Sequence, residues 1–149
     1  MDDLDRFVTA QDSGGTYAQA LAELRAGHKR THWMWFVLPQ VAGLGRSSTA
    51  RHYALADLAH AQAYLAHPVL GRRLRECAQA LQALSGDDAE QVLGPVDAQK
   101  LRSSMTLFAA ADPADPRFPA VLDKYFGGRA DEATLELLRP RRASSTGSP

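Results

Sequence analysis

The chain has little of what marks secreted, membrane or nucleic-acid-binding proteins. Its one cysteine, Cys77, excludes an intrachain disulfide and fits a reducing compartment. It carries no net charge, because 17 basic residues balance 17 acidic ones, so no overall field attracts nucleic acid or an anionic membrane. No apolar run approaches the ~20 residues that span a bilayer, and the acidic start MDDLDRF differs from a signal peptide. We therefore expect a cytoplasmic protein without a membrane partner, and nucleic acid is disfavoured as a partner.

Strand signals are also scarce, because alternating runs of β-branched residues are nearly absent. Apolar residues recur at helical spacing instead, and breaks such as DSGGT, GP and DPADP divide the chain into about eight or nine short helices. The sequence predicts one all-α domain over residues 1–138, with the helices packed in a compact array. Residues 139–149 carry no large apolar side chain and are expected to form a disordered tail.

Local signals predict where several helices begin. The longest helix is expected to have Pro68 in its first turn and to end near Leu84, with its polar side chains mostly toward water. Those polar side chains are Arg72, Arg73, Arg75 and Glu76. The residues expected to cap helices with an oxygen side chain are Ser47 or Ser48, Asp57, Asp87, Asp97 and Asp131.

The segment KRTHWMWFVLPQ, residues 29–40, contains both tryptophans of the chain. Residues 33–38 are predicted to form a short helix that Pro39 ends, although so short an apolar run is also compatible with a strand. Two roles remain open for the aromatic side chains. Trp33 and Trp35 either fill the core, or one of them lines a cleft where it can stack on a planar ligand.

The loop GLGRSST that follows has two interpretations. Gly43, Gly45, Arg46 and Ser47 combine flexible backbone, a cation and hydroxyl donors at a helix start, which suits an anion. The alternative is a structural loop whose serine only caps the next helix.

Two histidines lie in or directly before the aromatic segment of residues 29–40. His28 and His32 have the spacing of two metal ligands, but no neighbouring acid or cysteine completes a set, so no metal or cofactor is expected. His32 is either a hydrogen-bond donor at the edge of the aromatic helix or a ligand-binding or catalytic residue.

A second polar segment is KLRSSMTLFA, residues 100–109. Arg102 and Ser103 lie off the apolar stripe of the predicted helix, and Ser104 lies near its edge. The serines therefore mark either a tight packing site or a polar cluster that faces a pocket. No strained turn of the G-x-S-x-G kind and no spacing of paired carboxylates indicates a hydrolase.

These segments together resemble the domain-of-unknown-function 1810 family of small, mainly bacterial proteins. The resemblance rests on LRAGHKRTHWMWFVLPQVAGLGRSSTARHYAL, YLAHPVLGRRLREC, LRSSMTLFA and FPAVLDKYFGGRADEATLELL. It implies an all-helical fold with a right-handed superhelical arrangement of short helices, and it implies no activity. The positions that match the family's signature are His32, Trp33, Trp35, Gln40, Gly43, Gly45, Ser47, Arg102, Ser103 and Ser104.

We expect the two segments to meet in one cleft that binds a nucleotide-like or other anionic small molecule. Trp33 or Trp35 would form its wall, and Arg46, Arg102 and the 43–48 loop would contact the anion. His32, Gln40, Ser103 and Ser104 would orient the ligand. One alternative is a hydrolase or N-glycosidase that uses His32 as acid or base, and another is a module that binds a protein partner.

Overall fold

The computed structural model describes residues 3–139, and the all-α class is confirmed in that range. The described part has no named β-strand, and its one isolated β-bridge pairs Val41 with Leu55 in parallel. The helices are α1 (Asp5–Asp12), the 3-10 turn η1 (Ser13–Gly15), α2 (Thr16–Ala26), α3 (Met34–Val37), α4 (Ser48–His52), α5 (Leu58–Ala66), α6 (Leu70–Ala83), α7 (Ala89–Leu93), α8 (Pro95–Ala111), α9 (Arg117–Phe126) and α10 (Glu132–Leu138).

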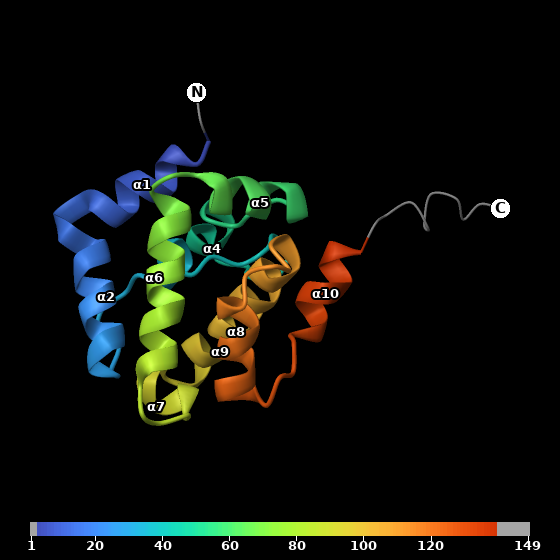
Figure 1. Cartoon of the computed structure of the whole chain (residues 1–149). Coiled ribbons are helices and arrows are strands. Elements are labelled where there is room, and N and C mark those ends of the chain that lie inside the picture. Colours follow the sequence, from blue (N-terminus) through green and yellow to red (C-terminus); the bar gives the residue numbers. More distant parts are fainter. Residues whose placement is uncertain (1–2, 140–149) are drawn as a thin grey trace.

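Helix α8 is the centre of the fold, because it packs against α5, α7, α9 and α10. Its buried residues point in every direction around the axis and include the small hydroxyl residues Ser103, Ser104 and Thr106. A helix that is buried on all sides does not show the polar face of a surface helix. Helix α6 lies between α2 and the α8–α9 pair, and α10 lies on the side of the molecule away from α2 (Figure 1).

A chain of aromatic rings runs through the core and joins four helices. The Phe7 ring of α1 meets the Tyr64 ring of α5 edge to face, with centroids 5.2 Å apart. Tyr64 lies 5.4 Å from Phe108 of α8, and Phe108 lies 5.9 Å from Phe118 of α9. All four side chains are fully buried, and pairs with this geometry stabilise a core beyond their buried area.

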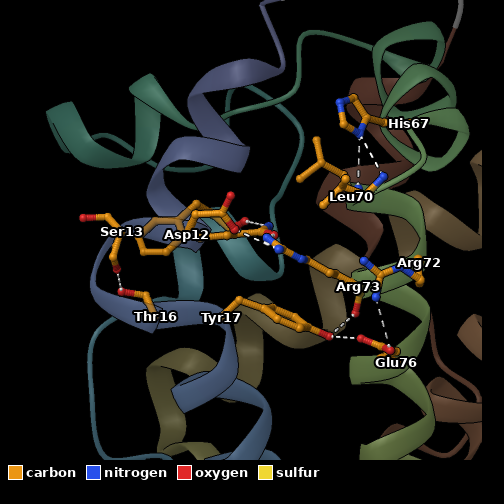
Figure 2. Close-up of polar contacts among 12 residues, drawn as sticks. Asp12, Ser13, Thr16, Tyr17, His67, Leu70, Arg72, Arg73 and Glu76 are labelled. Carbon is orange, nitrogen blue, oxygen red and sulfur yellow. Dashed lines mark hydrogen bonds and ion pairs between the residues drawn. The ribbon is translucent and has the colours of Figure 1, made fainter.

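A polar network joins α6 to the first two helices (Figure 2). The Arg73 guanidinium bonds Gln11 (3.1 Å), pairs with Asp12 (2.8 Å) and lies over the Tyr17 ring. The Tyr17 hydroxyl donates to Glu76 at 2.6 Å. The prediction that the polar side chains of α6 mostly face water is therefore wrong for Arg73, Arg75 and Glu76, because their partners are about 40 to 60 residues away in sequence and leave no local signal.

Several predicted local features are confirmed. Met34–Val37 is a helix, which resolves the choice between helix and strand for the aromatic segment. Ser47 caps α4, Asp57 caps α5 and Asp131 caps α10, each by accepting a backbone N–H two or three residues into the helix. These features depend only on neighbouring residues.

Other helix boundaries differ from the prediction. The longest described helix is α8, and α6 begins at Leu70 because the His67 imidazole accepts the N–H groups of Val69 and Leu70 (Figure 2). Asp88, not Asp87, caps α7. Pro95 starts α8, so Asp97 lies inside the first turn instead of capping it.

Of the predicted tail, Arg139 is the last described residue, and residues 140–149 lie outside the described range. Within residues 3–139, no helix combines the length and the apolar character that crossing a membrane requires.

Helix α6 passes close to the end of α5 at Gly71, and this contact yields a first prediction. A Cβ atom at Gly71 would overlap the backbone carbonyl of Leu65 and approach the Arg75 guanidinium to 2.9 Å. Gly71→Ala should therefore lower the free energy of unfolding by about 1–3 kcal/mol, the usual cost of overpacking. Chemical denaturation of the purified protein measures this change.

The matched control is Gly86→Ala, because a Cβ atom there meets nothing within 4 Å. Its free energy of unfolding should stay within about 0.5 kcal/mol of wild type. Equal stabilities for the two variants would contradict the close packing of α5 on α6.

Candidate functional site

The segment that leads into the aromatic helix has no regular structure, and the buried carboxylate of Glu23 on α2 holds it in place. Oε1 of Glu23 accepts the backbone N–H groups of Arg30 (2.8 Å) and Thr31 (3.1 Å) and the indole N–H of Trp33 (2.9 Å). Oε2 accepts the Thr31 hydroxyl at 2.6 Å and the Gln19 amide at 2.9 Å. One side chain thus accepts four donors of the segment, together with the Gln19 amide of α2.

These hydrogen bonds also set the charge of Glu23. Burial by itself would raise the pKa of this carboxyl group, since it disfavours the ionised form. The bonds from Thr31, Arg30, Gln19 and Trp33 outweigh burial and hold the pKa of Glu23 well below its usual range. The group is therefore ionised near neutral pH and is a poor proton donor.

The two tryptophans have different roles. Trp33 is fully buried, and its only polar atom is bonded to Glu23, so it belongs to the core. Trp35 is half-buried, and no described residue accepts a hydrogen bond from its indole. Of the two candidates for an aromatic wall, the structure leaves Trp35 accessible.

Two lysines and one aspartate bring the predicted segments together beside these rings. The Lys29 ammonium lies 2.9 Å from Asp97 and 5.2 Å from the centre of a Trp33 ring. The Lys100 ammonium lies 3.6 Å from Asp97 and 5.0 Å from the centre of a Trp35 ring. We call these five residues the aromatic junction. It has two cations for one carboxylate, and it joins the segment before α3 to the first two turns of α8.

Three predicted residues line a small cavity next to the junction. Trp35, Gln40 and Gly45 surround it with Tyr53 and other residues. At about 10 Å³ it is too small to enclose a ligand.

The loop after Gln40 is shaped by close packing. Gly43 has φ +106° and faces Leu137 of α10, and a Cβ atom at Gly45 would lie 2.5 Å from that of Ala50. Ser47 uses its hydroxyl to accept the Ala50 N–H at 3.1 Å. The glycines and the serine therefore have structural roles, and α4 has only five residues, so its N-terminus offers no extended set of free N–H groups.

His32 directly precedes Trp33 in sequence, Arg46 lies in the loop after α3, and both side chains are exposed. Among residues 3–139, neither side chain has a hydrogen-bond or ion-pair partner. They are free to contact a ligand. The same finding leaves His32 without the carboxylate that would position a catalytic histidine, since Asp97 pairs with the lysines and Glu76 with Tyr17 and Arg72.

The polar residues of the second segment are engaged elsewhere. Arg102 donates to the backbone carbonyls of Arg129 (2.9 Å) and Ala130 (2.8 Å), and it lines a cavity of about 660 Å³ between α7, α8 and α9. The Ser103 hydroxyl lies 3.1 Å from the buried Asp131 carboxylate. Ser104 is fully buried, and no described residue pairs with its hydroxyl.

The two predicted segments therefore meet through Lys100 and Trp35, and Arg102 faces a different cavity from Trp35, Gln40 and Gly45. Sequence reasoning missed Lys29, Lys100 and Glu23. The KR pair before the tryptophans was a signal for Lys29, and no local pattern indicated which cation reaches a ring. The described residues contain no group of three metal-ligating side chains.

Comparisons with known proteins agree with this fold. The family model described as "Protein of unknown function (DUF1810)" matches residues 1–138, and the chain belongs to this family. The crystal structure of the conserved hypothetical protein Rv1873 from Mycobacterium tuberculosis is similar, with 51% sequence identity and a TM-score of 0.88. The match covers 91% of this chain and 96% of that one. No protein in the curated set matches the chain significantly.

The hydrogen bonds of the Glu23 carboxylate yield a second prediction, which concerns the variant Glu23→Gln. The variant should lose about 2 kcal/mol of unfolding free energy near neutral pH, because charged hydrogen bonds to the segment disappear. A carboxyl group whose pKa is depressed on folding stabilises the protein above its unfolded pKa of about 4.3 and less as the pH falls below it. The stability difference between wild type and variant should therefore shrink under acid conditions.

Denaturant unfolding at a series of pH values measures this difference. Glu136→Gln on α10 is the control, because Glu136 is largely exposed and its ion pair with Arg139 is long, at 3.5 Å. A difference for Glu23→Gln that does not change with pH would contradict an ionised, hydrogen-bonded Glu23.

Proposed function

We propose that this protein is a cytoplasmic binding protein for a nucleotide-like, anionic small molecule, and that the ligand lies on the Trp35 face of the aromatic junction. The observation that supports this most directly is the Lys100 ammonium over the half-buried Trp35 ring. A planar group can stack on the indole, and the adjacent ammonium can pair with the anion. The base of a nucleotide can therefore stack on Trp35 while its phosphate pairs with Lys100.

The charges of the junction favour an anion. Asp97 is shared by Lys29 and Lys100, so one positive charge is in excess. The Lys29 side chain is 8% exposed and is fixed in the structure, whereas Lys100 is 24% exposed and its contact with Asp97 is longer. Lys100 is therefore the cation that a ligand can recruit.

Ligand binding requires Lys100 to leave the ring surface. A cation–π contact at a partly exposed site is worth only about 0.5–1 kcal/mol, so this movement costs little. The Gln40 amide lies beside Trp35 in the adjoining cavity, and His32 and Arg46 have no partner among the described residues. These three side chains are the further groups that we assign to orienting the ligand.

The contacts of the aromatic junction give less support to the two alternative functions, an enzyme and a protein-binding module. A hydrolase or N-glycosidase would need His32 beside an acid, but Asp97 is engaged with two lysines and Glu23 accepts the donors of Arg30, Thr31 and Trp33. A protein-binding module would need an apolar surface, and the large apolar side chains exposed in residues 3–139 are Val96 and Leu137. A polar, cationic face with one accessible indole suits a small anion better.

Binding of adenosine monophosphate, adenosine diphosphate and inorganic phosphate tests this proposal by calorimetry. We expect the nucleotides to bind more tightly than phosphate, since only they can stack. Lys100→Gln should weaken nucleotide binding about tenfold through the lost charged contact. Trp35→Leu should weaken it by a similar factor through lost stacking, worth about 1–3 kcal/mol per base.

Arg25→Gln is the control, because Arg25 is exposed on α2 and has no side-chain partner among the described residues. It should bind as wild type does. Trp33 remains in Trp35→Leu, and its emission reports that the core is intact. Wild-type affinity in both Lys100→Gln and Trp35→Leu would place any ligand elsewhere and refute the proposal.

A further inference from the structure

A second surface rich in cations lies away from the aromatic junction, where the turn between α5 and α6 meets the start of α9. A cavity of about 460 Å³ is lined there by three arginines, Arg72, Arg75 and Arg117. Leu65, Ala66 and Pro68 provide apolar lining, and the remaining lining residues are His67, Glu76 and Gln79. None of these residues belongs to the junction.

The back of this cavity is rigid because Arg75 and Asp115 fix each other. Nε of Arg75 donates to Asp115 at 2.9 Å, and its Nη1 and Nη2 atoms reach the Leu65 carbonyl (3.4 Å) and Asp112 (3.5 Å). Asp115 is 7% exposed and also accepts the backbone N–H and the Nη1 group of Arg117. Burial would raise the pKa of Asp115, but these bonds lower it, so the anchor stays ionised.

The front of the cavity offers guanidinium groups that are not used. Within residues 3–139, Nε and Nη2 of Arg117 have no acceptor, because Asp115 takes only the backbone N–H and Nη1. The Arg72 side chain is 60% exposed, and its one partner is Glu76 at 3.6 Å.

Glu76 does not depend on Arg72. Its other oxygen accepts the Tyr17 hydroxyl at 2.6 Å, as Figure 2 shows. Arg72 can therefore turn toward a ligand while Glu76 keeps its position. An exposed pair of this length contributes little stability that would oppose the change.

The charges around the cavity balance when Asp112 and Asp115 are counted with Glu76 against the three arginines. Recognition there depends on directed N–H groups and not on a long-range field. A guanidinium presents parallel N–H groups that match two oxygens of an oxyanion. Two such groups from different helices can each pair with two of the three terminal oxygens of a phosphate monoester, whereas a carboxylate has two oxygens and can pair in this bidentate way with only one guanidinium.

We propose that this arginine cavity binds the phosphate group of a small phosphate monoester, whose organic part contacts Leu65, Ala66 and Pro68. The site is separate from the aromatic junction and does not depend on the function proposed for it. Arg72 and Arg117 are the residues that contact the phosphate. Arg75 is a positioning residue, since its N–H groups are bonded to Asp115, Asp112 and Leu65.

Calorimetric titration of the full chain with phenyl phosphate, inorganic phosphate and benzoate tests this inference. Phenyl phosphate should bind more tightly than inorganic phosphate, because its ring covers the apolar lining. It should also bind more tightly than benzoate, because a carboxylate can form the bidentate pairing with only one of the two guanidinium groups. Arg72→Gln and Arg117→Lys should each weaken phenyl phosphate binding about tenfold, the effect of losing a charged, directed hydrogen bond.

Arg117→Lys keeps the charge and removes the parallel N–H groups, so it separates directed recognition from simple attraction. Thermal melting of each variant shows whether it is folded, and the Nε–H signals of Arg72 and Arg117 in wild-type nuclear magnetic resonance spectra give a readout without mutation. Arg51→Gln on α4 is the control for losing one exposed arginine.

Three outcomes would overturn the inference. The first is wild-type affinity in both Arg72→Gln and Arg117→Lys, and the second is benzoate binding as tightly as phenyl phosphate. The third is loss of phenyl phosphate binding in Lys100→Gln alone, which would place the phosphate at the aromatic junction and leave the proposed function standing. Conversely, nucleotide binding that fails while phenyl phosphate binds at the arginine cavity would refute only the proposed function.

Discussion

The carboxylate of Glu23 is the interaction on which the candidate site depends. Residues 28–33 leave α2 without forming a helix or strand, so their N–H groups need partners other than a backbone ladder. The Glu23 carboxylate accepts those of Arg30 and Thr31 from within α2 and at the same time binds the indole of Trp33, while the Lys29 N–H donates to the Val92 carbonyl. The position of Trp33 determines where α3 starts, and α3 carries Trp35 to the surface beside Lys100.

Buried acids elsewhere in the fold also accept hydrogen bonds that join one element to another. Asp115 joins the start of α9 to Arg75 on α6, and Asp131 joins the start of α10 to Gln99 and Ser103 on α8. Short helices create many chain ends, and each end leaves unpaired backbone groups. Hydrogen bonds outweigh burial at both aspartates and hold their pKa values below the usual range. These acids are therefore structural anions.

The sequence predicted features whose causes are local and failed where the cause is a distant contact. Helical spacing indicated the all-α class, and the caps at Ser47, Asp57 and Asp131 depend on the next three residues only. Asp97 had an equally good local pattern for a helix cap, but Pro95 starts the helix earlier and the Asp97 carboxylate forms an ion pair with Lys29. Trp35 was predicted as a possible wall, whereas Lys100 as its partner follows only from how α8 packs.

Zero net charge conceals two kinds of cation in this protein, and only the structure separates them. Four cations are bound to carboxylates or backbone carbonyls of distant parts of the chain and act as structural links, namely Arg73, Arg75, Arg102 and Lys124. Lys100, Arg72 and Arg117 retain donors that the described residues do not use fully. The second group lies on two separate surfaces with different geometry. An ammonium beside an accessible indole favours a planar anion. Two guanidinium groups in a cavity that is also lined by apolar residues favour a phosphate monoester.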